Sequence, residues 1–236
     1  MPTWNELFTD EAHRERVPAG EVHRAILLME RTFAARPLRI WDLGCGAGRH
    51  SLLIASLGHR VYASDVSPNA VDLTKNWLAD ANLDGQAAVS NMTDSPFDGE
   101  TFHGVICWHT IHHNTLANIR RTVDEAHRRL LPGGLFLVNA KSTKSDRYGH
   151  GREIERNTFV EEGDGDADVP HHHFDEDGIR DLFPLGQWEF VSLVERIMRY
   201  VRRGEAFLER NPFEYTKWEA CLKKREPASG TAGARR

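Results

Sequence analysis

Short apolar runs and longer segments of helical periodicity alternate through the middle of the chain. The apolar runs, typical of strands, stand at residues 38–43, 60–65, 87–90, 103–108 and 135–140. Helical periodicity is found at residues 47–57, 68–79 and 116–131. Because the strand runs are almost continuously apolar, we expect a parallel sheet covered by helices on both faces. The pattern predicts a doubly wound α/β fold with a mostly parallel, seven-stranded sheet.

Before this region, residues 4–35 carry apolar side chains such as Val22 and Ile26 on one helical face. We expect an amphipathic helix that packs on the sheet. Trp4 and Phe8, at its start, either fold over a cleft or pack the helix onto the sheet, and the demands of an ordinary core favour packing.

After residue 140 the alternation stops. Residues 141–174 are polar and acidic, and the segment is too long for an ordinary connection, so we expect a functional lid. A helix at 175–183 and strands at 187–201 and 213–224 follow, the strands forming an antiparallel hairpin at the end of the sheet. The expected units are an N-terminal helical cap (1–36), a Rossmann-like core (37–140), the lid (141–175), a C-terminal helix and hairpin that complete the same sheet (176–224) and a disordered tail (225–236).

The stretch RIWDLGCGAGRH, residues 39–50, places three glycines directly after the first strand. Gly44, Gly46 and Gly48 lack Cβ atoms, so the loop can adopt positive φ values and a ligand can lie against the backbone. The helix that follows presents free N–H groups, which attract a carboxylate. Asp42 adds a negative charge that suits an ammonium group. Together these features predict a ligand with an amino-acid moiety.

A second acidic residue, Asp65, ends the next strand 21 positions after Gly44. A carboxylate at this place can accept hydrogen bonds from both hydroxyls of a ribose. The spacing differs from the dinucleotide fingerprint, because Arg49 and Ser51 stand where a third glycine would be needed. Taken singly, the glycines can also form a tight turn without a ligand, and Asp65 can cap a helix.

Four motifs together resemble the class I S-adenosylmethionine-dependent methyltransferases: IWDLGCGAGRH, VYASDVS, NMTDSPFDGETFHGVICWHTIHH and LLPGGLFLV. The resemblance covers residues 38–140 and implies S-adenosylmethionine as cofactor and S-adenosylhomocysteine as product. With the glycine loop, it assigns the cofactor to Asp42, Gly44, Cys45, Gly46, Gly48, Asp65, Val66, Asn91, Met92 and Trp108. The family usually has Asp where this chain has Asn91, and the amide oxygen still accepts a hydrogen bond.

Methyl transfer from a sulfonium is an in-line displacement, and a base is needed when the acceptor is a hydroxyl or a protonated amine. His109, His112 and His113 follow the fourth strand, where the family's active site opens. His172 belongs to the stretch VPHHHF, and the resemblance connects a similar Pro-His-His-aromatic stretch with the substrate. We take these four histidines as candidate catalytic residues. Structural packing is the alternative, and no metal site is expected because no carboxylate stands at ligand spacing.

The composition narrows the class of acceptor. The chain has 30 Lys and Arg against 35 Asp and Glu, a formal net charge of -5, which gives no general attraction to phosphate backbones. Three widely spaced cysteines and the lack of a long apolar segment predict buried thiols in a cytoplasmic protein. We therefore expect a small-molecule acceptor, no membrane partner and no nucleic acid, while the sequence leaves the oligomeric state unknown.

Two rival functions remain at this point. The first is an RNA or protein methyltransferase, for which the lid offers five basic residues: Lys141, Lys144, Arg147, Arg152 and Arg156. The second is a regulatory protein that binds the cofactor without transferring a methyl group.

Overall fold

The computed structural model describes residues 4–9, 14, 16–161, 169–200 and 213–226. Its helices are α1 (Trp4–Leu7), α2 (Gly20–Thr32), α3 (Arg49–Ser56), α4 (Pro68–Asp80), α5 (Leu116–Arg129) and α6 (Glu176–Asp181). Its strands are β1 (Arg39–Leu43), β2 (Arg60–Asp65), β3 (Gly85–Val89), β4 (Phe102–Cys107), β5 (Leu130–Ser142), β6 (Arg152–Glu155), β7 (Thr158–Val160), β8 (His171–Phe174), β9 (Trp188–Tyr200) and β10 (Phe213–Lys224).

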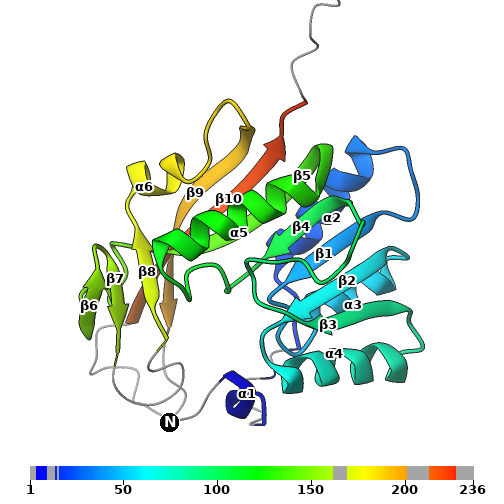
Figure 1. The fold of residues 1–236 in the computed structure, drawn as a ribbon, viewed down its shortest axis with the longest axis horizontal. Coiled ribbons are helices and arrows are strands. Elements are labelled where there is room, and N and C mark those ends of the chain that lie inside the picture. The colour runs from blue at the N-terminus through cyan, green and yellow to red at the C-terminus, as the bar shows by residue number, and fades with distance from the viewer. Residues whose placement is uncertain (1–3, 10–13, 15, 162–168, 201–212, 227–236) are drawn as a thin grey trace, which may run out of the picture.

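The longer strands form the predicted sheet, in the order β3-β2-β1-β4-β5-β10-β9 (Figure 1). Strands β1 to β5 are parallel to one another, and β10 is antiparallel to both β5 and β9. The α/β class, the mostly parallel sheet and the terminal antiparallel hairpin are thus confirmed. Three short strands extend the sheet beyond these seven. Strand β8 pairs with the end of β5 at Lys141 and His173, β7 pairs with β8, and β6 pairs with β7.

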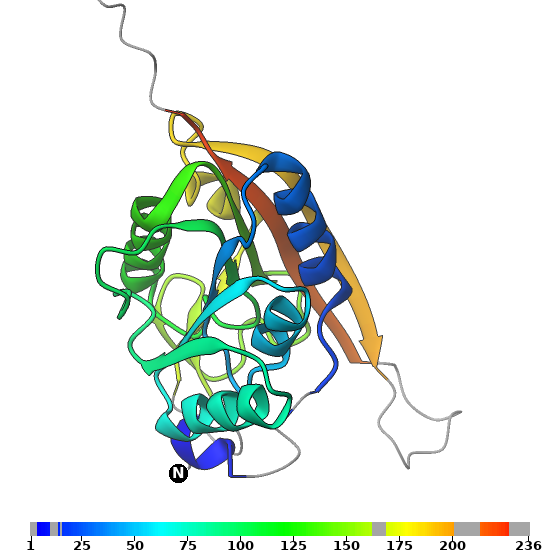
Figure 2. The same cartoon turned by 90° about the vertical axis from the view of Figure 1, so that its right-hand side faces the viewer.

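Helices cover both faces of the sheet, as the apolar runs predict (Figure 2). Side chains of β1 alternate between two cores: Trp41 belongs to the core under α5 and α6, and Ile40 to the core under α2, α3 and α4. This alternation follows from the period of two along a strand. Because β1 pairs in parallel with both β2 and β4, the carboxyl ends of these three strands lie at one edge of the sheet.

The structure corrects the expected elements in three places. The single helix expected within residues 4–35 is divided into α1 and α2, and α2 begins just after Pro18, which cannot continue a preceding helix. Strand β5 begins at Leu130 instead of residue 135. The expected lid contains β6, β7 and β8, while its residues 162–168 lie outside the described part of the chain. Most of the expected tail, residues 227–236, lies outside it as well.

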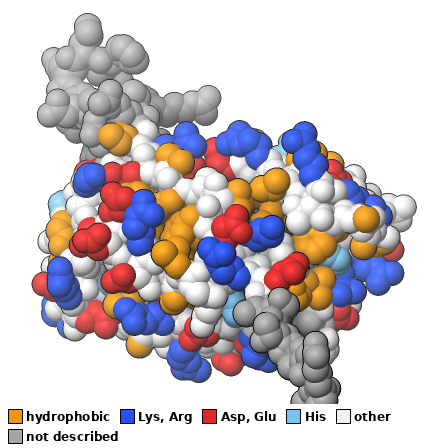
Figure 3. Space-filling view, turned by 90° about the horizontal axis from the view of Figure 1, so that it is seen from above, with side chains coloured by type: hydrophobic (Ala, Val, Ile, Leu, Met, Phe, Trp, Pro, Cys, Tyr) orange, Lys and Arg blue, Asp and Glu red, His pale blue; other side chains and the backbone are white. Residues whose placement is uncertain are grey.

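Two findings on composition follow from the described residues. The three cysteines are free and buried, as expected for structural thiols. None of the described helices is long and apolar enough to cross a bilayer. On the face seen in Figure 3, basic and acidic side chains are interspersed with apolar ones.

Candidate active site

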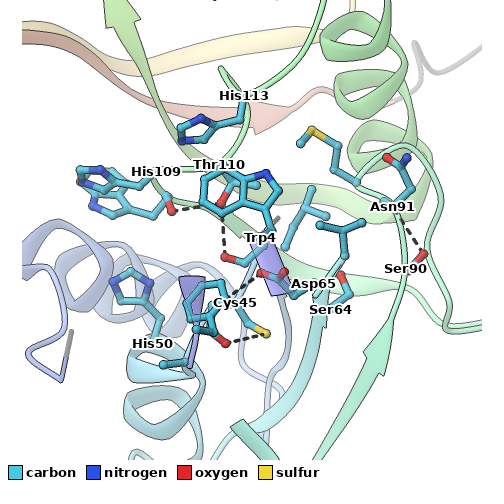
Figure 4. A pocket seen from close by; sticks show the side chains of 18 of the residues that line it. Trp4, Cys45, His50, Ser64, Asp65, Ser90, Asn91, His109, Thr110 and His113 are labelled. Carbon is cyan, nitrogen blue, oxygen red and sulfur yellow. Dashed lines mark hydrogen bonds between the residues drawn. The ribbon is translucent and has the colours of Figure 1, made fainter. Parts of the chain in front are cut away.

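A cavity of about 360 Å³ opens where the carboxyl ends of β1, β2 and β4 meet (Figure 4). This is the edge where ligands bind in open parallel sheets. The wall is built by α1, the glycine loop after β1, the end of β2, the segment after β3 and the turn after β4. The volume falls within the range of about 300–1,000 Å³ that is usual for small-molecule sites.

The glycine loop has the backbone that the sequence predicts. Gly44, Gly46 and Gly48 have φ values of 75°, 54° and 93°, which residues other than glycine rarely adopt. A Cβ atom on Gly44 would lie 2.2 Å from Cγ2 of Thr110, so this glycine lets the turn after β4 approach the loop. Gly48 does not line the cavity: a Cβ there would lie 2.7 Å from Oγ1 of Thr74, so its role in the structure is contact with α4.

Asp65 lines the cavity and is held from both sides. Its Oδ2 accepts a hydrogen bond from the Gly46 amide at 2.9 Å, and its Oδ1 accepts one from the Ser67 amide at 2.9 Å. Burial raises the pKa of the carboxyl group, and the backbone hydrogen bonds oppose that shift. Each oxygen keeps a lone pair for a ligand hydroxyl. The predicted residues Val66, Asn91 and Met92 also line the cavity.

Asp42, predicted to bind the ligand's ammonium group, is buried below the loop and does not line the cavity. Its Oδ2 accepts a hydrogen bond from Oγ of Ser51 at 2.6 Å. Burial raises the pKa of Asp42 to about 7, and the nearby charge of Asp65 adds to the shift. Cys45 lines the cavity, and burial raises the pKa of its thiol.

The residues after β4 form a turn and not a helix. Trp108 lines the cavity. His109, with φ of 60°, is in a left-handed conformation that is uncommon for residues other than glycine. The His109 amide donates to Oδ1 of Asn139 at 2.6 Å, and Oγ1 of Thr110 donates to the Gly44 carbonyl at 3.3 Å. These bonds dock the turn onto the sheet and onto the glycine loop.

The four candidate catalytic histidines occupy different environments. His109 and His113 line the cavity. Burial lowers the pKa of His109 to about 3, and the positive charge of Lys217 contributes. His112 is buried behind the cavity wall, and burial holds its pKa well below the usual range. His172 does not line the cavity either, and burial lowers its pKa to about 4.

Helix α1 and the residue directly after it contribute two aromatic side chains to the cavity. Trp4 and Phe8 both line the cavity (Figure 4 shows Trp4 beside His113), which fits the alternative that they fold over a cleft. Asn5 holds α1 in place, because the Asn69 amide donates to its Oδ1 at 2.9 Å. The sequence gives no signal for this contact, since it joins residues more than 60 positions apart.

The sequence also misses several other wall residues. They are Leu43, Ala47, Arg49, His50, Ser64, Ser90, Thr110 and Asn114. Most of them are direct neighbours of the predicted residues, so extending each motif by one position would have found them. Within the described ranges, no group of three or more His, Cys, Asp or Glu side chains is arranged to hold a metal ion.

Comparisons with known proteins agree with this geometry. Residues 40–134 match the model of a methyltransferase domain. This stretch of the chain is a methyltransferase domain, in line with the resemblance to the class I S-adenosylmethionine-dependent methyltransferases. An S-adenosylmethionine-dependent methyltransferase from Methanosarcina mazei has a similar fold. The match covers 89% of this chain and 100% of that one, with a TM-score of 0.69 and 19% sequence identity.

Two curated relatives of the methyltransferase domain show how far the likeness extends. A ubiquinone biosynthesis O-methyltransferase from Mesorhizobium japonicum is 32% identical over 108 residues, which are 44% of this chain and 43% of that protein. The ribosomal RNA small subunit methyltransferase C from Alcanivorax borkumensis is 35% identical over 119 residues, which are 48% of this chain and 36% of that protein. The chain thus spans less than half the length of these relatives.

Proposed function

We propose that the protein transfers a methyl group from S-adenosylmethionine to a small-molecule acceptor. The observation that carries the proposal is that residues suited to the cofactor and residues suited to a methyl acceptor line the same cavity. Asp65 and the glycine loop suit the cofactor, and Trp108 and His113, on the turn after β4, suit an acceptor beside it.

The residues present fit the cofactor. The N-terminus of α3 offers backbone N–H groups for its carboxylate, the glycine loop lets the cofactor lie close to the backbone, and the Asp65 carboxylate suits the ribose hydroxyls. Asn91 and Met92 line the wall next to them and suit the adenine. When bound, the cofactor supplies a methyl group on a sulfonium, which is already an activated leaving group. Asp42 and Gly48 shape the loop from behind the wall.

On the acceptor side, the protein has to orient the acceptor and exclude water. Well-aligned pairs reach effective molarities of roughly 10⁵–10⁸ M, so positioning alone supplies a large part of the acceleration. Trp4 and Trp108 line this part of the cavity with aromatic surface. His113 is the candidate proton acceptor, because it lines the cavity, whereas His112 and His172 lie behind it and His109 has a pKa of about 3.

A small molecule is favoured over RNA because two of the five basic residues in the lid are paired with acidic residues of the protein. Lys144 forms a salt bridge with Glu195, and Arg147 forms one with Glu161, so these two charges are neutralised within the protein. The relatives' names include both a ubiquinone biosynthesis O-methyltransferase and a ribosomal RNA methyltransferase, and the RNA function therefore stays as the second candidate.

The test is a methyl-transfer screen with radiolabelled S-adenosylmethionine across hydroxyl, thiol and amine acceptors and across ribosomal RNA. We expect label in a small molecule, with RNA binding that is weak and lost as salt rises. Label found in RNA alone would establish the second candidate. Cofactor binding without transfer to any acceptor would point to the regulatory alternative.

A further inference from the structure

Strand β8 carries three consecutive histidines, all of them buried, and its backbone is fixed from two sides. The His172 amide donates to the His112 carbonyl at 2.8 Å, and the His173 amide donates to the Asn157 carbonyl at 2.8 Å. His173 is also paired with Lys141 at the end of β5. The first of these bonds ties β8 directly to the turn that carries His112.

The three side chains of β8 have different neighbours. The ring of His171 lies 4.7 Å from the ring of His113, edge to face. The Nδ1 atom of His172 lies 2.6 Å from Oγ1 of Thr158. His173 packs between aromatic rings of the lid, with Phe159 at 5.8 Å and Tyr148 at 5.6 Å. Of the three, His171 is the one in ring contact with a histidine that lines the cavity.

Three aromatic or imidazole rings contact the imidazole of His113. Trp4 approaches it at 4.9 Å, His112 at 4.3 Å and His171 at 4.7 Å between ring centroids. These contacts come from α1, from the turn itself and from β8. Because three separate elements pack against one ring, its orientation toward the cavity is set by tertiary structure, and His171 is the contribution of the lid.

We propose that His171 is a positioning residue that holds the imidazole of His113 against the methyl acceptor, and that the acceptor is a small molecule with a proton on the atom that is methylated. The inference rests on the proposed function. A lone pair of the acceptor oxygen, sulfur or nitrogen forms the bond to the methyl carbon. The carbon–sulfur bond breaks with its electron pair going to sulfur. The acceptor's proton goes to a ring nitrogen of His113.

Positive charges lie around the turn that carries His113. Lys141 is the second-to-last residue of β5, the Nζ atom of Lys217 lies 4.9 Å from the centroid of the Trp108 ring, and Arg49 lines the cavity. Among the described residues that line the cavity, Asp65 carries a carboxylate, and it belongs to the part of the wall that we assign to the cofactor. Burial, with the neighbouring His113 and Lys141, holds the pKa of His112 low.

The test compares His171→Ala with His173→Ala, a matched control two positions along the same strand and equally buried. We expect His171→Ala to lower kcat about tenfold, because a misplaced base loses part of the roughly 10²–10⁴-fold contribution of general base catalysis. The KM for S-adenosylmethionine should stay unchanged. His173→Ala should keep kcat, and His171→Phe, which retains a ring at the contact, should restore most of it. Equal kcat in both alanine variants would overturn the inference.

A second readout does not depend on turnover. In the S-adenosylhomocysteine complex, the titration of the His113 ring is followed by NMR of its imidazole nitrogens in the wild type and both alanine variants. We expect a shifted midpoint in His171→Ala, where water replaces the lost ring, and the wild-type midpoint in His173→Ala. An unchanged His113 titration would refute the positioning role. Failure of S-adenosylhomocysteine to bind would instead refute the proposed function.

Discussion

The replacement of Gly44 by alanine tests how the glycine loop and the turn after β4 are packed together. An L-residue in a left-handed conformation is destabilised by roughly 1–2 kcal/mol. The added Cβ would also lie 2.2 Å from Cγ2 and 2.3 Å from Oγ1 of Thr110. Overpacking of this kind adds about 1–3 kcal/mol. We therefore expect Gly44→Ala to lower the free energy of unfolding by about 2–5 kcal/mol.

Gly58 provides a matched control, because its φ is 80° and a Cβ there would meet no atom within 4 Å. Gly58→Ala should show the backbone effect alone, about 1–2 kcal/mol. Urea unfolding measures both variants, and calorimetry measures their affinity for S-adenosylhomocysteine. Only Gly44→Ala should weaken binding, since the clash displaces the cavity wall. Equal losses of stability in the two variants, or unchanged binding by Gly44→Ala, would refute the reasoning.

Three further predictions concern Asp42, Glu155 and Phe8. The pKa of Asp42 rises from 3.8 to about 7 on folding, so between these pH values the folded protein holds a proton that the unfolded chain has released. As the pH rises from about 4 to about 7, the wild type should therefore lose stability relative to Asp42→Asn. The slope in urea unfolding should approach ~1.4 kcal/mol per pH unit. Glu155→Ala removes the carboxylate that accepts from the Leu116 amide at the start of α5, at 2.6 Å, and should lower stability by about 1–2 kcal/mol, with a smaller loss in Glu155→Gln. Phe8→Ala should weaken S-adenosylhomocysteine binding about tenfold in calorimetry, because an aromatic wall is lost.

The parts of the fold and site that could be predicted are those where one short segment holds the information. The glycine loop and Asp65 were found because a strand, a turn and a helix start follow one another in the chain, and the backbone at Gly44 has the positive φ expected of it. The terminal hairpin was found because alternation marks each strand. In both cases local sequence and tertiary structure favour the same conformation.

The parts that could not be predicted depend on contacts between distant segments. Phe8 enters the cavity because Asn5 is hydrogen-bonded near the start of α4, and no local pattern encodes that path. In β8, alternation shows that His171 and His172 face opposite sides, but which one faces His113 depends on how β8 pairs with β5 and β7. The sequence therefore does not show which of the two faces the substrate, and His172, which we predict there, does not line the cavity.

The most direct test of the account is the binding of S-adenosylhomocysteine to the purified wild type and to Asp65→Ala, measured by calorimetry. The account predicts binding by the wild type and a loss of at least about 100-fold in Asp65→Ala, since each hydrogen bond to a charged group contributes about 1.5–3 kcal/mol and ~1.4 kcal/mol is a factor of ten. No binding by the wild type, or equal affinities of the two proteins, would contradict the claim that this cavity holds the cofactor.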